Sequence, residues 1–329
     1  MQHASMQYSK DAGPIDKKKS KYAIEVMETD KSKIPQRQAS KDGILPKFPF
    51  SMMISGSSGS GKTNLLMNIM TRDDLFGRYF HYIIVFSPTA GSTDDMYKKL
   101  NIPESNFIRE MKSEMLTNLI ANRKARIEEK GIVWVAKNER MCVIMDDVIA
   151  ERSFLESPDA LRMFALLRHY LCAIIVLVQS YNKLPRSLRL NANAVMVFPA
   201  QQSEIAVLLD EITPAGLQKR EFENVIQYAT TERYHFLYIN RHAKPRDQIR
   251  HNLDEVINIE DFKQARYSDR RASNVTTNRG SVAGTAGSHE IKSQRGEDRG
   301  NGHSGDEETT REPSESSNAR QLLQRPKDY

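Results

Sequence analysis

The chain has 329 residues, of which 39% are hydrophobic, and a formal net charge of +6 at pH 7. This length suits one large α/β domain with flanking tails, and the presence of only two cysteines excludes a disulfide-stapled scaffold. The positive charge suggests an acidic partner, but most of the excess lies in the two terminal segments, so charge alone does not assign nucleic-acid binding to the core.

Two polar segments flank the part of the chain that can form a core. Residues 1–44 carry a run of three lysines among Ser, Asp and Gln, and we expect a disordered basic arm. Residues 263–329 are rich in Ser, Arg, Gly, Asn and Glu with hardly any aromatics, which predicts a disordered low-complexity tail. One domain is therefore expected at 45–262.

The apolar runs of this chain are short. The longest strongly apolar run covers 171–178, which is far too short to span a bilayer, and residues 1–10 contain no apolar signal core. Cys142 and Cys172 both lie in apolar runs and are expected to be buried and unbridged. We therefore expect a soluble, intracellular protein without a membrane partner.

Short apolar runs alternate with helical patterns through the predicted domain. Runs of strand length occur at 50–55, 82–86, 141–145, 173–178, 194–198 and 235–239. Apolar residues with helical spacing occur at 62–71, 110–129, 159–170 and 204–209. This alternation predicts an α/β fold with a doubly wound, mainly parallel sheet.

A complete phosphate loop follows the first predicted strand and opens the first predicted helix. Its pattern, G-x-x-x-x-G-K-[ST], is formed by Gly56, Ser57, Ser58, Gly59, Ser60, Gly61, Lys62 and Thr63. The glycines let backbone N–H groups surround phosphates, and the positive end of the helix adds to their binding. The pattern predicts a P-loop NTPase fold and binding of a nucleoside triphosphate.

Two carboxylates follow the third predicted strand. We expect Asp146 to hold Mg²⁺, directly or through water, together with the Thr63 hydroxyl. Asp147 is placed to polarise a water against the γ-phosphate, and Lys62 to bridge the β- and γ-phosphates. The alternative is that the Asp pair merely begins a loop. A carboxylate beside the metal ligand favours a hydrolase over a kinase.

Gln179 ends the next predicted strand. The carboxyl edge of an open α/β sheet is the side on which ligands bind, so this side chain is expected beside the phosphate loop. There it could contact the γ-phosphate or its water and report hydrolysis. The alternative is an ordinary polar residue at a strand end.

Arg186 and Arg189 follow within a short segment before the 194–198 run. They are candidates for an arginine finger that acts on the nucleotide of a neighbouring subunit. Such a residue accelerates turnover by about 10³–10⁵. The alternative is a solvated turn with two exposed arginines.

The order of these motifs resembles the poxvirus-type DNA-packaging ATPases, which belong to the FtsK/HerA superfamily of P-loop translocases. The resemblance covers about residues 46–262 and leaves both tails outside. Besides the phosphate loop, it rests on Phe86-Ser87-Pro88-Thr89-Ala90, Asp146-Asp147, Arg168-His169-Tyr170, the strand ending in Gln179, the Leu-Pro-x-x-Leu-Arg-x-Asn segment at 184–191 and Tyr238-Ile239-Asn240-Arg241.

The resemblance implies an ATP- and Mg²⁺-dependent ring, a hexamer or pentamer, that threads double-stranded DNA into a preformed capsid. Its implied partners are double-stranded DNA, further copies of itself and capsid or portal-vertex proteins. Its implied place is an assembly site in the host cytoplasm or nucleus, or the virion. Carried over residue by residue, the finger falls on Arg189 first and Arg186 second. Cellular relatives usually have Glu where this chain has Asp147, whose side chain is one methylene shorter.

Two other classes remain open from the residues alone. A nucleotide-gated assembly scaffold would bind ATP without motor work, and its hydrolysis would ignore DNA. A small-molecule kinase would consume ATP only with an acceptor, but neither lid arginines nor an acceptor pocket can be placed in the sequence.

Overall fold

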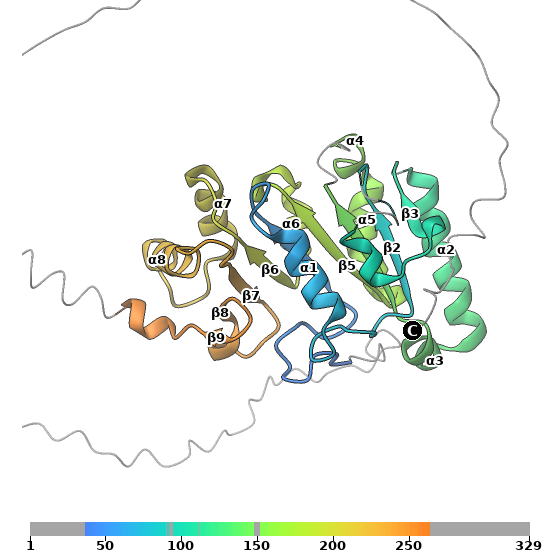
Figure 1. Ribbon diagram of the computed structural model, residues 1–329, viewed down its shortest axis with the longest axis horizontal. Helices are drawn as coiled ribbons and strands as arrows, with labels where there is room; N and C mark the ends of the chain where they lie inside the picture. The colour runs from blue at the N-terminus through green and yellow to red at the C-terminus, as the bar shows by residue number, and fades with distance from the viewer. Residues whose placement is uncertain (1–36, 90, 92–94, 111, 148–151, 264–329) are drawn as a thin grey trace, which may run out of the picture. The chain divides into compact units, whose positions relative to one another are not determined.

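The computed structural model describes residues 37–89, 91, 95–110, 112–147 and 152–263. Within this part of the chain, the strands form one mixed sheet in the order β3-β2-β4-β5-β1-β6-β7-β8-β9 (Figure 1). The strands are β1 (Ser51–Ser55), β2 (Tyr82–Phe86), β3 (Phe107–Ile108), β4 (Met141–Asp146), β5 (Cys172–Val178), β6 (Ala194–Val197), β7 (Leu237–Asn240), β8 (Ile249–His251) and β9 (Glu255–Val256). The expectations for residues 1–36 and 264–329 lie outside the described residues.

The strands from β1 to β6 pair in parallel. β1 lies between β5 and β6, and β4 lies between β5 and β2, so the chain crosses over the sheet between successive strands. β7, β8 and β9 extend the sheet in antiparallel pairing. The predicted doubly wound, mainly parallel sheet is confirmed, and each predicted strand exists with ends shifted by at most two residues.

The helices agree with the predicted ones in part. They are α1 (Lys62–Thr71), α2 (Ser113–Lys130), α3 (Ile132–Asn138), α4 (Arg152–Leu155), α5 (Pro158–Leu166), α6 (Arg186–Asn191), α7 (Gln202–Ile212) and α8 (Lys219–Ala229). The helix predicted at 159–170 ends as an α-helix at Leu166 and continues as the 3₁₀ helix η4 (Leu167–Tyr170). Neither α6 nor α8 was predicted, because α6 is short and carries four polar residues, and α8 is mostly polar.

Both faces of the sheet are covered. Met53 of β1 belongs to a core that also contains residues of α2, α5, α7 and α8. Since side chains alternate along a strand, Met52 and Ile54 point to the opposite face, where α1 lies in front of the sheet in Figure 1. This double coverage explains why every residue of β5 is buried and why the strands read as continuous apolar runs.

The described domain begins before the predicted boundary at residue 45. Arg37 forms an isolated antiparallel bridge with Phe48. The carbonyl oxygen of Ile44 accepts hydrogen bonds from the Tyr238 hydroxyl at 2.8 Å and from Asn240 Nδ2 at 3.2 Å. The first contact joins Arg37 to the segment before β1, and the other two attach Ile44 to β7.

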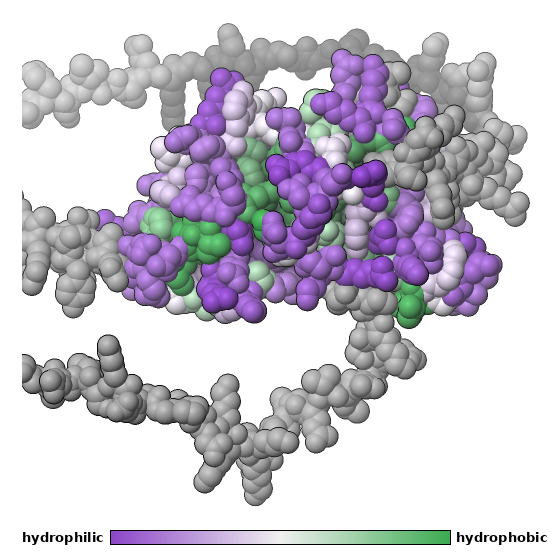
Figure 2. All heavy atoms as spheres, turned by 60° about the horizontal axis from the view of Figure 1, so that its bottom comes forward, coloured by the Kyte–Doolittle hydropathy of each residue, from purple (hydrophilic) through white to green (hydrophobic). Residues whose placement is uncertain are grey.

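The two cysteines are free and buried, as predicted, and burial raises the pKa of both thiols. Among the residues that the structure describes, no helix is both long and apolar enough to cross a bilayer. One face of the molecule is mainly hydrophilic, with hydrophobic residues gathered in separate patches (Figure 2).

Candidate active site

The phosphate loop connects β1 to α1. Gly59 and Gly61 have φ angles of 73° and 105°, a left-handed conformation that glycine adopts without steric cost. Gly61 is the residue that caps α1, so no side chain caps the first turn of this helix. Its N–H groups therefore face the loop as donors for an anion, and the helix dipole favours the same charge.

Gly56 is packed too closely for any side chain. A Cβ atom at this position would lie 2.6 Å from Phe198 Cβ and 2.7 Å from Ser60 Oγ. The Gly56 N–H also donates to the carbonyl of Val178 at 3.1 Å. The loop is therefore held between the end of β5 and the residue that follows β6.

The Lys62 side chain folds back onto the phosphate loop. Its Nζ donates to the carbonyl oxygens of Gly56 at 2.8 Å and of Ser57 at 2.9 Å. Burial lowers the pKa of Lys62, while the carboxylates of Asp146 and Asp147 act in the opposite direction. A phosphate would offer this ammonium group charged acceptors, which form stronger hydrogen bonds than neutral carbonyls.

Asp147 and Gln179 are in direct contact. β4 and β5 pair in parallel with Asp146 opposite Leu177, so both strands end at the same edge of the sheet. Gln179 Nε2 donates to Asp147 Oδ1 at 2.8 Å. Asp147 has a φ of 53°, a conformation that Asp tolerates better than most residues and that often marks functional positions. The amide thus orients the carboxylate predicted to act on water.

These side chains share one cavity of about 450 Å³ at the carboxyl edge of the sheet. Its lining consists of Ser58, Gly59, Gly61, Lys62, Thr63, Asn64, Thr89, Met96, Tyr97, Asp146, Asp147, Leu177 and Gln179. The fold therefore brings together the phosphate loop, the Asp pair and the Gln-ending strand, which are far apart in the sequence.

Tyr97, on the 3₁₀ helix η1 (Tyr97–Leu100), was not predicted as a site residue. Its hydroxyl donates to Asp146 Oδ2 at 2.8 Å, and the buried ring packs edge-on against Phe107 with centroids 5.8 Å apart. No local pattern distinguishes this tyrosine from a core residue. Only the fold places it beside Asp146.

The chemistry of the site fits a magnesium ion. The Thr63 hydroxyl and the Asp146 carboxylate line the same cavity, and both are oxygen donors. Mg²⁺ prefers oxygen ligands and is usually held by one or two carboxylates together with substrate phosphates and waters. These two residues would hold it.

Arg189 is buried within its own domain. Its Nε and Nη2 donate to the Glu211 carboxylate at 2.9 Å and 2.6 Å, and its Nη1 donates to the carbonyl of Leu184. Only 7% of the residue is exposed. A finger that enters a neighbouring subunit needs an accessible guanidinium, so this burial argues against the preference for Arg189.

Arg186 is the accessible arginine of the pair. Its side chain is 72% exposed at the start of α6, with Nε 3.5 Å from Glu211 Oε1. Burial pushes the pKa of Glu211 upward, but hydrogen bonds from Arg189 and Tyr181 outweigh it and keep that pKa below its ordinary value. Glu211 is therefore an anion that pairs tightly with Arg189 and only loosely with Arg186.

Known proteins resemble this chain in sequence. The profile of the family described as the poxvirus A32 protein matches residues 38–259. The DNA packaging protein OPG160 of vaccinia virus (strain Copenhagen) is 29% identical over 202 residues, which cover 60% of this chain and 70% of that protein. The protein of the same name from variola virus shows the same identity and coverage.

Solved structures with a similar fold include the genome packaging NTPase B204 from Sulfolobus turreted icosahedral virus 2 in complex with AMP. It is 14% identical, covers 61% of this chain and 96% of its own, and has a TM-score of 0.43. B204, the DNA-packaging ATPase from Sulfolobus turreted icosahedral virus, is 16% identical with a TM-score of 0.45, covering 61% of this chain and 96% of its own.

Proposed function

The chain belongs to the poxvirus A32 protein family, and from this premise we propose that it hydrolyses ATP to drive double-stranded DNA into a viral capsid. The observation that carries the proposal is the single cavity that contains the phosphate loop, Asp146, Asp147 and Gln179. The name of the viral relatives, DNA packaging protein, supports packaging as the use of the energy.

In this proposal the phosphate loop binds the triphosphate. Lys62 exchanges the carbonyls of Gly56 and Ser57 for the β- and γ-phosphate oxygens, and the N–H groups at the start of α1 surround the phosphates. Asp146 and Thr63 hold Mg²⁺, which when bound neutralises charge on the phosphate oxygens. The loop thus binds ATP in one orientation, with its γ-phosphate toward the Asp pair.

Asp147 orients and deprotonates the attacking water. Gln179 holds the Asp147 carboxylate through a hydrogen bond of 2.8 Å and lies where it can exchange this bond for one to the water or the γ-phosphate. The hydrogen-bond partner of Gln179, at the end of β5, would then depend on whether ATP or its hydrolysis products are bound. Such a change of partner can shift the elements next to β5.

A homo-oligomeric ring completes the site in trans. Arg186 is exposed at the start of α6 and supplies the positive charge for the transition state in the neighbouring subunit, while Arg189 supports α6 through its buried pair with Glu211. The ring acts with capsid or portal-vertex proteins at sites where virions assemble. Its DNA contacts are to the phosphate backbone and do not read sequence.

Tyr97→Phe is expected to raise the Mg²⁺ concentration for half-maximal ATP turnover by about tenfold. The substitution removes the hydroxyl that orients Asp146, and loss of such a supporting hydrogen bond typically costs 10–100-fold in metal affinity. The measurement is ATP turnover over a Mg²⁺ titration. Tyr181→Phe is the matched control, because it also removes a hydroxyl bonded to a carboxylate, that of Glu211, outside the cavity. An equal shift in both variants would contradict the role of Tyr97.

Duplex DNA is expected to accelerate ATP turnover, and added salt to abolish the acceleration between about 50 and 200 mM, because phosphate contacts release counterions. The experiment compares ATPase activity with and without duplex DNA, alongside a native mass measurement of the full chain. If the protein is monomeric and its ATP turnover does not change when duplex DNA is added, the motor proposal is wrong and the nucleotide-gated scaffold is favoured.

A further inference from the structure

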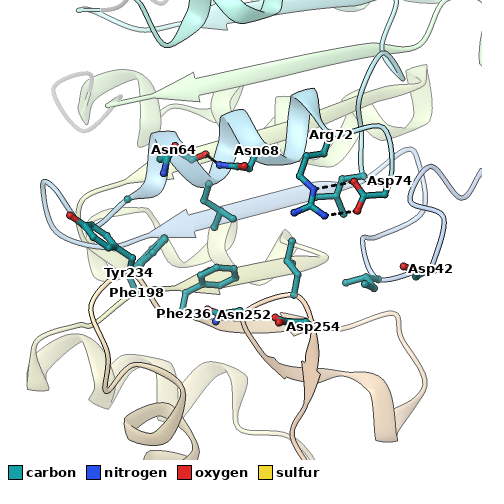
Figure 3. A pocket seen from close by; sticks show the side chains of 15 residues that line it. Asp42, Asn64, Asn68, Arg72, Asp74, Phe198, Tyr234, Phe236, Asn252 and Asp254 are labelled. Atoms are coloured by element: carbon teal, nitrogen blue, oxygen red, sulfur yellow. Dashed lines mark hydrogen bonds and ion pairs between the residues drawn. The ribbon is translucent and has the colours of Figure 1, made fainter.

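A second cavity of about 480 Å³ adjoins the phosphate site (Figure 3). It lies between α1 and the segments around β7 and β8. Gly61 and Asn64 line both cavities, so both border the first turn of α1. A ligand held at the phosphate loop can therefore extend into this second space.

Aromatic rings form one wall of the second cavity. Phe198 and Phe236 are buried and pack against each other with centroids 5.3 Å apart. Tyr234 lies at the end nearest the phosphate loop, where its Cδ1 would be 3.2 Å from a Cβ at Gly61. This wall offers an aromatic, largely apolar surface next to the phosphate loop.

Tyr234 differs from the two aromatic residues that follow it in alternation. Phe236 and Tyr238 are buried in the packed domain. Tyr234 precedes β7, is 52% exposed and has a φ of 69°, which is rare for a bulky residue. The Arg233 guanidinium lies 4.7 Å from its ring centroid. Core packing does not account for a strained, half-exposed ring at this place.

The charges of the second cavity do not suit a phosphate. Arg72 is paired with Asp74 through two hydrogen bonds of 3.0 Å and 2.6 Å, and Asp42 and Asp254 also line the space. Asn252 Oδ1 accepts a hydrogen bond from the Phe236 N–H at 3.1 Å, and within the described part of the chain its Nδ2 group makes no hydrogen bond. The space thus suits an uncharged ring with polar edges.

We propose that this cavity binds the base and ribose of the nucleotide whose triphosphate lies in the phosphate loop, and that Tyr234 stacks on the base. The inference rests on the proposed function, because it places the rest of the same nucleotide. The amide of Asn252 and the carboxylate of Asp254 face the polar edge of the base. The site therefore selects a nucleoside triphosphate over a bare triphosphate.

Calorimetric binding to the full chain with Mg²⁺ tests this inference, with a non-hydrolysable ATP analogue and inorganic tripolyphosphate as the two probes. Tyr234→Ala is expected to weaken the ATP analogue roughly tenfold, since stacking of a base on an aromatic ring contributes on that order, and to leave tripolyphosphate unchanged. Tyr234→Phe keeps the ring and should retain both affinities. Tyr228→Ala is the matched control, because Tyr228 on α8 is 46% exposed and lies outside the cavity.

Two results would overturn the base site. An equal loss for both probes in Tyr234→Ala would mean that the ring only supports the phosphate loop, and no loss for either would place the base elsewhere. Failure of the proposed function appears differently: the wild type would bind the analogue more tightly than tripolyphosphate, with the Tyr234 dependence intact, yet would not hydrolyse ATP.

Discussion

Asp147→Asn is expected to reduce ATP turnover by about 10²–10⁴ while ATP binding is retained, because the neutral amide cannot accept a proton from the attacking water. Asn also tolerates the left-handed conformation that Asp147 adopts with a φ of 53°, so the loop should keep its shape. The measurements are single-turnover hydrolysis and equilibrium binding of ATP to the same preparation.

Lys62→Ala is the contrast for this experiment. It removes the ammonium group next to the phosphates and should abolish hydrolysis together with much of the ATP affinity, whereas Asp147→Asn should separate the two. Normal turnover in Asp147→Asn would refute the assignment of the base. If Asp147→Asn lost both turnover and ATP binding, Asp147 would be a residue that supports the fold of the site.

Arg186→Ala is expected to lower ring turnover by about 10³–10⁵, or about 4–7 kcal/mol of barrier, if its guanidinium stabilises the transition state in a neighbouring subunit. Because the side chain is 72% exposed, the monomer should lose little stability. Mixtures of variant and wild-type subunits provide the measurement. Activity should fall more steeply than the fraction of variant, and a strictly proportional loss would remove the role in trans.

Arg189→Ala is the internal comparison for this prediction. Its removal leaves the Glu211 carboxylate buried without its main partner, which typically costs about 3–5 kcal/mol of folding stability. We therefore expect a large loss in chemical denaturation, against a small one for Arg186→Ala. If Arg189→Ala folded with wild-type stability and still poisoned mixed rings, the finger would return to Arg189.

Much of the candidate site was predictable because its residues occur in short contiguous sequence motifs. A phosphate loop must be contiguous, and strands that end in Asp146-Asp147 and in Gln179 are recognisable as buried runs followed by polar residues. Their shared edge follows from the parallel sheet, which the alternation of strands and helices predicted. The family resemblance inferred from the same motifs is confirmed by the match over residues 38–259.

Other features depend on contacts between distant segments, and no local pattern carries them. In the sequence, Arg186 and Arg189 look equivalent; one turn of α6 separates an exposed guanidinium from one buried against Glu211. Tyr97 resembles any core tyrosine until η1 sets its hydroxyl on Asp146.

The fold class, the nucleotide loop and the Asp pair can be identified from residue patterns alone, because backbone geometry and phosphate chemistry require particular residues at particular spacings. The packing of the folded chain determines which arginine is accessible, which tyrosine donates to Asp146 and that Tyr234 lies beside the phosphate loop. Burial and hydrogen bonding between residues far apart in the chain are properties of the packed molecule, and they exist only once the sheet and its helices have assembled.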